Sequence, residues 1–200
     1  MRAWAPPLLA STAAAYVAAQ TSSNRALFVA NGQTRQAAEC PESFTQWTSK
    51  AHRPYSAGAL GLPTMRPPAD CRTFVSPAVE QAIANVTQRI KDADVRQLFA
   101  NAMGSTLDTA VAWHEADDLE PYTFVITGDI NAQWTRDSAN QMMPLVAYVA
   151  GDRALRKLVA GLVNMQAEQI AAYPFANAYQ PPGRSGLRPA ENSWAKSDRA

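Results

Sequence analysis

Between residues 76 and 172, four segments repeat apolar side chains at three- and four-residue intervals, and this helical spacing constrains the fold more than any other feature. Ser76 and Pro77 suit the cap and first position of the first segment, and Asp92 or Asp94 suits the cap of the second. Alanine, the strongest helix former, supplies 39 of the 200 residues. The sequence therefore predicts an all-α fold of antiparallel helix pairs.

An extended segment separates the two helix pairs. Residues 107–113 continue the helical spacing, whereas residues 122–127 (YTFVIT) are β-branched and aromatic and predict a short strand. Asp137 or Ser138 suits the cap of the third helix. Pro144 lies inside that helical pattern, so the helix is expected either to kink there or to start just before this residue.

The fourth helix has a signal at each end. Asp152 suits its cap, and Pro174 is expected to end it. Its predicted buried residues are Leu155, Leu158, Val159, Leu162, Val163 and Ile170. The second helix has a corresponding apolar side, formed by Val95, Leu98, Phe99 and Ala102. Both sets follow the spacing that places side chains on one helix face.

The beginning of the chain has an uneven charge distribution. No acidic residue precedes Glu39, and 22 uncharged residues separate Arg2 from Arg25. A basic start, a short apolar stretch and small residues are typical of a secretory signal peptide, which we expect at residues 1–19. A mitochondrial leader and a signal anchor are the alternatives. The stretch is mostly alanine and contains two prolines, so it is a poor transmembrane helix.

Residues 20–74 are predicted to form a flexible start followed by a Pro- and Gly-rich loop. Cys40 and Cys71 are the only cysteines, and an even pair in a secreted chain usually forms a disulfide. Two buried free thiols are the alternative. Asn85 begins the only Asn-x-Ser/Thr sequence and is a candidate glycosylation site.

The charge balance and the absence of several motifs exclude many classes of function. The net charge of +1 gives no reason to expect a nucleic acid or an acidic membrane surface as a partner. His52, His114 and the two cysteines lack metal-ligand or redox spacing. The sequence has no phosphate-binding Gly-rich loop, HExxH or GxSxG motif. We therefore predict neither a metal nor a cofactor, and we expect both histidines to lie at the surface or to be hydrogen-bonded.

Polar and aromatic groups that suit a sugar gather in TGDINAQWTRDS, residues 127–138. The carboxylates of Asp129 and Asp137 accept hydrogen bonds from hydroxyls, and Arg136 donates in a rigid fork. Trp134 offers an apolar face and one N–H donor. The alternative is structural: a helix cap, an ion pair of Arg136 with either carboxylate, and a core tryptophan. The two carboxylates also suit an acid and base pair, but sequence does not give the separation that such a role requires.

Two longer stretches carry a family resemblance: FVITGDINAQWTRDSANQMMPLVAYVAGD and LVAGLVNMQAEQIAAYPFANAYQPP. Together with CRTFVSPAVE they resemble glycoside hydrolase family 125, over roughly residues 40–188. Members of this family are inverting, metal-independent exo-α-1,6-mannosidases with an (α/α)6 toroid of six helical hairpins. Gln133, Thr135 and Phe175 depart from the apolar residue (commonly Met), the Leu and the Tyr that are usual there.

The resemblance implies a mannose-containing glycan, an α-1,6-linked mannoside, as the substrate. It implies that Arg136 and Asp137 bind hydroxyls of the terminal mannose and that Trp134 shapes this subsite, with Asp129 and Asn177 supporting or lining it. The general acid and the general base are expected downstream of Ala200. Because WTRDS also occurs in glucoamylase-like (α/α)6 enzymes, another glycosidase of that type is the alternative.

Residues 75–200 contain about four predicted helices, whereas six hairpins require twelve. We therefore expect about the first two hairpins of the toroid, in an N-terminal fragment of a secreted mannosidase that is inactive by itself. A non-catalytic mannose-binding remnant and a plain helical domain are the alternatives. An incomplete toroid is expected to leave apolar helix faces exposed. After removal of the signal peptide, no membrane association is expected.

Overall fold

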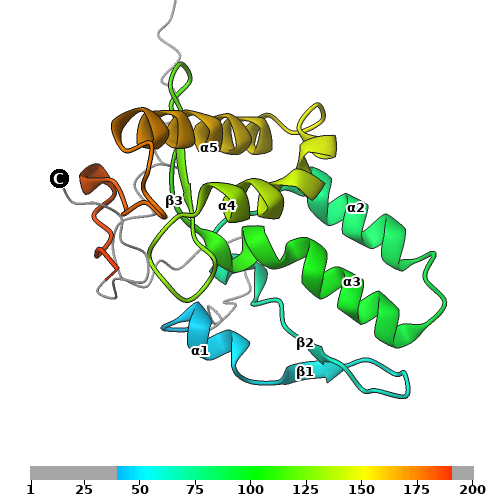
Figure 1. Cartoon of the computed structure of the whole chain (residues 1–200). Coiled ribbons are helices and arrows are strands. Elements are labelled where there is room, and N and C mark those ends of the chain that lie inside the picture. Colours follow the sequence, from blue (N-terminus) through cyan, green and yellow to red (C-terminus); the bar gives the residue numbers. More distant parts are fainter. Residues whose placement is uncertain (1–39, 191–200) are drawn as a thin grey trace, which may run out of the picture. The chain divides into compact units, whose positions relative to one another are not determined.

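The computed structural model describes residues 40–190 of the chain. The predicted signal peptide, residues 1–19, and residues 20–39 of the predicted flexible start lie outside the described residues. About half of residues 40–190 are helical, and two small antiparallel sheets of two strands each join the helices (Figure 1). The helical prediction is therefore correct for most elements, but the all-α class is not, because only one of the four strands, at 122–127, was predicted. Among the described helices, none is both long and apolar enough to cross a membrane.

The elements follow one another in the order α1 (Phe44–Thr48), β1 (His52–Tyr55), β2 (Pro63–Thr64), η2 (Ala69–Cys71), α2 (Pro77–Thr87), α3 (Ala93–Ser105), η3 (Thr106–Ala110), β3 (Val111–Glu115), β4 (Tyr122–Val125), α4 (Thr135–Met142), η4 (Met143–Tyr148), α5 (Arg153–Ala172) and η5 (Gly183–Ser185). The η segments are single turns or short 3-10 helices, except η3, which is a π-helix.

Residues 40–74 contain only short elements, as their content of proline and glycine predicts. A disulfide joins Cys40 to Cys71, with the two Cα atoms 5.2 Å apart. The indole N–H of Trp47 donates to the carbonyl of Met65 at 2.9 Å, and the ring of His52 stacks on the indole. These contacts hold α1 against the chain that follows the β1–β2 hairpin.

Helices α2 and α3 lie side by side as an antiparallel pair, as Figure 1 shows. Ser76 caps α2 by accepting a hydrogen bond from the Val79 N–H, and Pro77 occupies the first helical position, as predicted. Asp92, rather than Asp94, caps α3 by accepting from two backbone N–H groups. The short loop between the two helices explains their antiparallel arrangement.

The structure corrects the predicted apolar side of α3. Val95 and Leu98 are 52% and 58% exposed, whereas the opposite, polar side of α3 contacts the β1–β2 hairpin. Asn101 donates to the Pro63 carbonyl and accepts from the Met65 N–H, both at 3.0 Å. The reason is that hydrogen bonds with the hairpin bury this polar side, which periodicity alone does not reveal.

Residues 107–113 were predicted to continue the helix, but they do not form a regular α-helix. They run through the π-helix η3 into strand β3, which pairs with β4 from Val111↔Val125 to Glu115↔Tyr122. The predicted strand at 122–127 is β4, which ends at Val125. Because β4 leaves its backbone groups unpaired unless a partner strand is present, its pairing with β3 outweighs the helical spacing there.

Helix α4 begins three or four residues earlier than the predicted caps, Asp137 or Ser138, would place it. Trp134 occupies its cap position without a side-chain cap, so Asp137 and Ser138 lie inside the helix rather than before it. The Ser138 hydroxyl donates to the Trp134 carbonyl at 2.7 Å. The chain then passes into the 3-10 helix η4 at Met143, so the helical geometry changes directly before Pro144. Of the two predicted alternatives, a start just before Pro144 does not apply, because α4 begins at Thr135.

Helix α5 lies along the β3–β4 hairpin and builds the main core with it (Figure 1). It begins after Asp152 and ends before Pro174, as predicted. Its buried apolar residues are Leu155, Leu158, Leu162 and Met165, and they pack with Phe124 and Val125 of β4. Val163 and Ile170, predicted to be buried, are 59% and 43% exposed, because the hairpin covers only one side of α5.

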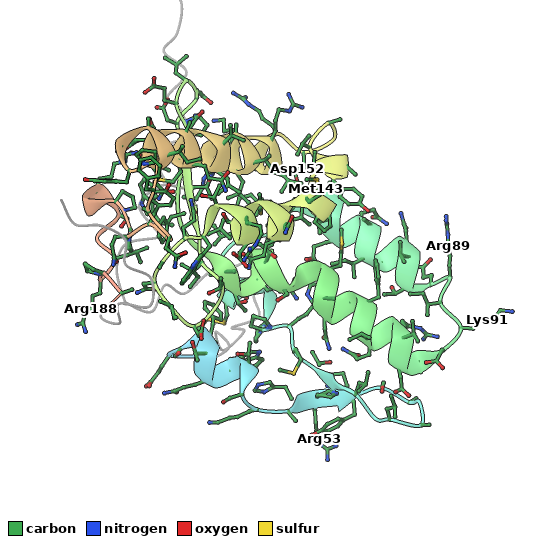
Figure 2. The ribbon with its side chains drawn as sticks, in the orientation of Figure 1. Arg53, Arg89, Lys91, Met143, Asp152 and Arg188 are labelled. Atoms are coloured by element: carbon green, nitrogen blue, oxygen red, sulfur yellow. A yellow bond between two sulfur atoms is a disulfide. The ribbon has the colours of Figure 1, made fainter. Side chains whose placement is uncertain are left out.

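Asp152 joins the starts of α2 and α5, and Figure 2 shows it beside the N-terminus of α5. Its carboxylate accepts from the Leu155 N–H at 3.0 Å and from the Ser76 hydroxyl at 2.6 Å. Burial by itself raises the pKa of Asp152, but these bonds and those from the backbone N–H groups of Ala78 and Ala154 lower the pKa below its ordinary value. One carboxylate thus stabilises two helix N-termini.

This lowered pKa predicts acid sensitivity. The unfolded chain binds a proton at Asp152 more readily than the folded chain, so stability is present above about pH 4 and is lost as the pH falls further. We expect the midpoint of urea unfolding to fall less between pH 6 and pH 3 in Asp152→Asn than in the wild type. Equal falls in the two proteins would contradict this role of Asp152.

Candidate functional site

The two motif segments, residues 127–138 and residues 176–179, meet in the structure although 37 residues of sequence separate them. Gln133 and Tyr179 form an antiparallel bridge, in which each backbone N–H donates to the other residue's carbonyl at 2.9 Å. The adjacent Ala132 and Ala178 are completely buried in a small apolar cluster with Ile130, Trp134 and Ala190. The bridge therefore holds the loop before α4 against the segment that follows α5.

The predicted site residues lie around this bridge. Asp129 is exposed in the loop before it, where its carboxylate accepts from the Thr127 hydroxyl at 3.3 Å. Gly128 has a φ of 133°, a conformation that favours glycine, and its carbonyl accepts from the Thr45 hydroxyl at 3.2 Å. Asn177, exposed in the second segment, directly precedes Ala178. We call this meeting of residues 127–134 with residues 176–179 the junction. It places the segment that carries Asp129 next to the segment that carries Asn177.

Trp134, Arg136 and Asp137 come from the start of α4. The indole of Trp134 is half-buried against the small apolar cluster, so it contributes to packing as well as to the surface. The side chain of Arg136 is 82% exposed, and its guanidinium lies 3.5 Å from the Asp137 carboxylate. An exposed ion pair of this kind contributes little to stability. Asp137, in the first turn of α4, also lies where a helix stabilises negative charge.

The geometry leaves Arg136 and Asp137 accessible to a ligand. Neither side chain is required for a cap or for the core. The N-terminus of α4 therefore presents a fork of N–H donors and a carboxylate within three residues of the Trp134 indole. These groups suit the hydroxyls and the C–H face of a pyranose. A hollow of about 240 Å³ lies beside α1, between Pro41 and His52, and no motif residue lines it. Asp129, Arg136 and Asn177 are exposed, so these motif residues lie at the surface of the described part of the chain.

Three glutamines support this surface, and sequence reasoning assigned none of them a role. Gln166 of α5 donates to the Thr135 carbonyl at 3.1 Å and to the Ser138 hydroxyl at 2.9 Å, which ties the start of α4 to α5. Gln133 is completely buried and donates to Gln169, also on α5, at 2.9 Å. A signal was present in the sequence, because Gln166 and Gln169 form a polar pair, three residues apart, beside the apolar side of α5.

The histidines have structural environments. The ring of His52 is hydrogen-bonded to the Trp47 carbonyl at 2.9 Å. His114 contacts the Tyr122 carbonyl and the Thr123 hydroxyl, and burial lowers its pKa. Within residues 40–190, no group of three or more His, Cys, Asp or Glu side chains is arranged to hold a metal ion.

Comparison with known proteins identifies relatives of the motif region. The family model described as metal-independent alpha-mannosidase (GH125) matches residues 92–200. The meiotically up-regulated gene 157 protein of Schizosaccharomyces pombe (strain 972 / ATCC 24843) is 44% identical over 160 residues, which are 80% of this chain and 31% of that protein. The chain thus spans about a third of the length of this relative. The matched region contains α3 to α5 and both motif segments.

Proposed function

Because this chain belongs to the GH125 family of metal-independent alpha-mannosidases, we propose that it is part of an exo-acting glycosidase that removes terminal α-1,6-linked mannose with inversion. Its substrate is a mannose-containing glycan. The observation that carries the proposal is the junction of the two motif segments, where an accessible arginine and carboxylate in the first turn of α4 follow a half-buried tryptophan at its cap. An exo-acting glycosidase needs such a set of groups to grip the terminal sugar.

In this proposal, Arg136 and Asp137 bind hydroxyls of the terminal mannose. The guanidinium donates to ring-substituent oxygens and the carboxylate accepts from a pair of hydroxyls. Trp134 shapes the subsite with the exposed part of its indole. Asp129 and Asn177 line the subsite from the two segments that the Gln133–Tyr179 bridge holds together.

We also propose that these residues are the N-terminal part of an (α/α)6 toroid, with the general acid and base in sequence beyond Ala200. The exposed apolar side chains on α3, η4 and α5 support this proposal, because further helical hairpins would cover them. These side chains are Val95, Leu98, Met143, Val146, Val163 and Ile170. On this basis we expect the 200-residue chain by itself not to turn over α-1,6-mannobiose. Clear turnover would mean that the acid and base lie within it.

Asp137→Ala tests the sugar-binding role in the longest product that the gene encodes. Loss of hydrogen bonds to a charged group is expected to lower kcat/KM for α-1,6-mannobiose by roughly 100-fold. Asp118→Ala is the control, because Asp118 is exposed on the loop between β3 and β4 and pairs with Lys157 and Arg153. It should leave kcat/KM unchanged. Normal turnover by Asp137→Ala would remove Asp137 from the subsite.

If the longest product binds α-1,6-mannobiose but releases no mannose, the chain belongs to a non-catalytic mannose-binding protein. Turnover of an α-linked glucoside in place of the mannoside would favour the glucoamylase-like alternative. Both outcomes would leave the sugar-binding role of the junction intact, and each would exclude the proposed mannosidase reaction.

We propose a secretory route for the protein. The Cys40–Cys71 disulfide suits an oxidising compartment, and Asn85 is exposed on α2, where its amide oxygen accepts from Gln81. Expression in a eukaryotic secretory host is expected to yield a mass increase that a glycosidase specific for N-linked glycans removes. Asn85→Gln should abolish the increase, and Thr87→Ser, which keeps the acceptor sequence, should retain it. An unmodified wild-type protein would contradict the proposal.

A further inference from the structure

We infer that Gln133 is a positioning residue, which holds the two motif segments in the arrangement that the sugar subsite requires. The inference rests on the proposed function for its effect on substrate, but its structural part stands on contacts alone. Gln133 is completely buried, although it carries a polar amide, and its hydrogen bonds reach β4, α5 and the segment after α5.

The backbone and the side chain of Gln133 make different connections. Its backbone N–H and carbonyl form the two-bond bridge to Tyr179. Its side-chain Oε1 accepts from the Val125 N–H at 2.7 Å, at the end of β4. Its Nε2 donates to Oε1 of Gln169 on α5 at 2.9 Å. The loop that carries Asp129 is therefore tied to the sheet and the long helix through one side chain.

The orientation of both amides follows from the backbone. The Val125 N–H requires an acceptor, so the oxygen of the Gln133 amide faces it and the nitrogen faces Gln169. Gln169 must then present its own oxygen, which leaves its Nε2 without a hydrogen-bond partner among the described residues. A buried donor without a partner destabilises the folded state. The unpaired Nε2 of Gln169 therefore offsets part of the stabilisation that the two side-chain hydrogen bonds of Gln133 contribute.

The side-chain hydrogen bonds of Gln133 reinforce the bridge between Gln133 and Tyr179. A single bridge of two backbone hydrogen bonds opens more easily than a longer pairing of strands. The buried amide prevents residues 131–134 from sliding along residues 177–180, because sliding would leave the Val125 N–H and the side-chain Oε1 of Gln169 unpaired. The positions of Trp134 and Asn177, which lie on the two sides of the bridge, are therefore held constant relative to each other.

Gln133→Met tests the inference, because methionine has a similar length and no hydrogen-bonding amide. In the 200-residue chain, we expect hydrogen exchange of the Tyr179 N–H to become at least about tenfold faster, although its own backbone acceptor is unchanged. In the longest product, we expect KM for α-1,6-mannobiose to rise at least about tenfold. Gln97→Met is the control: Gln97 donates to Thr64 and Asn101 between α3 and the β1–β2 hairpin. It should change neither value.

Gln133→Glu covers the case in which the methionine variant does not fold. A protonated glutamic acid accepts from the Val125 N–H with one oxygen and donates to Gln169 with the other, so it reproduces the amide. In acid, where the introduced carboxyl group is protonated, we expect this variant to match the wild type in Tyr179 N–H exchange and in KM. At neutral pH, we expect its exchange to be faster and its KM to be higher than those of the wild type at the same pH. Variants whose Tyr179 exchange matches that of Gln97→Met would overturn the inference. Absence of mannobiose turnover in the wild type would instead contradict the proposed function, and the exchange measurement would still decide the role of Gln133.

Discussion

Replacing Asp108 by alanine is expected to destabilise the folded chain by about 3–5 kcal/mol, because it leaves two buried guanidinium groups without their shared partner. Asp108 is 1% exposed and lies in η3. Arg66 donates to both of its carboxylate oxygens, at 2.6 and 2.9 Å, and Arg72 lies 3.3 Å from it. Glu80 of α2 completes the cluster through further bonds to both arginines.

The cluster holds together parts of the chain that lie far apart in sequence. Burial tends to lower the pKa of Arg66, but hydrogen bonds with Asp108 and Glu80 raise it above its ordinary value, so the guanidinium stays charged. Nearby backbone bonds from Thr73 and Phe74 to the carbonyls of η3 complete the attachment. The segment of residues 66–74, α2 and η3 therefore depend on one buried carboxylate.

Urea unfolding of Asp108→Ala, followed by circular dichroism, measures this loss. Asp118→Ala is the matched control, since Asp118 also pairs with two basic residues but is exposed, and its midpoint should differ little from that of the wild type. If the two variants unfold at the same urea concentration, the buried cluster does not carry the stability assigned to it.

Gly161→Ala is expected to cost about 2–3 kcal/mol, although alanine favours a helix by about 1 kcal/mol over glycine. A Cβ at Gly161 would overlap the Thr123 hydroxyl oxygen and would lie 2.8 Å from the Tyr122 carbonyl carbon. Backbone atoms of β4 have no room to move, so α5 would have to shift away from the hairpin. The shift would also weaken the bond from the Thr123 hydroxyl to the Leu158 carbonyl, now 2.8 Å long.

Gly151→Ala provides the comparison, because a Cβ there would meet only the Tyr148 carbonyl oxygen, at an ordinary 3.9 Å. Its midpoint of urea unfolding should equal or slightly exceed that of the wild type. The near-ultraviolet circular dichroism of Gly161→Ala should weaken at the same time, since the aromatic residues of β3 and β4 lie under α5. A stabilised Gly161→Ala protein would show that the close approach of α5 to β4 is not required.

Local signals predicted the ends of the helices well. Ser76, Asp92 and Asp152 cap helices where their side chains reach backbone N–H groups two or three residues ahead, so the bonds depend only on nearby sequence. The start of α4 was missed by three or four residues, because the cap position falls at Trp134, next to the bridge between Gln133 and Tyr179, and is not marked by a capping side chain. Helix α4 therefore starts where tertiary contacts allow it.

The candidate site divides in the same way. The residue types of TGDINAQWTRDS and ANAY pointed to a sugar and to the GH125 family, and the comparisons confirm the family. The sequence did not reveal that Gln133 and Tyr179 join these segments, because their contact spans 46 positions and has no local pattern. Two parts of the structural alternative are also observed: Trp134 packs against a small apolar cluster, and Arg136 forms an ion pair with Asp137. Both are compatible with the proposed binding roles.

The sequence by itself determined where most helices begin and end and which family the chain belongs to, because caps, helix breakers and motifs act over a few neighbouring residues. Only the tertiary structure decided which helix faces are buried. Val95 and Leu98 of α3 follow an apolar pattern yet remain exposed, while Asn101 on the other side is engaged by the β1–β2 hairpin. Burial depends on which distant segment satisfies a helix's hydrogen bonds and covers its surface, and that choice is made among all parts of the fold at once.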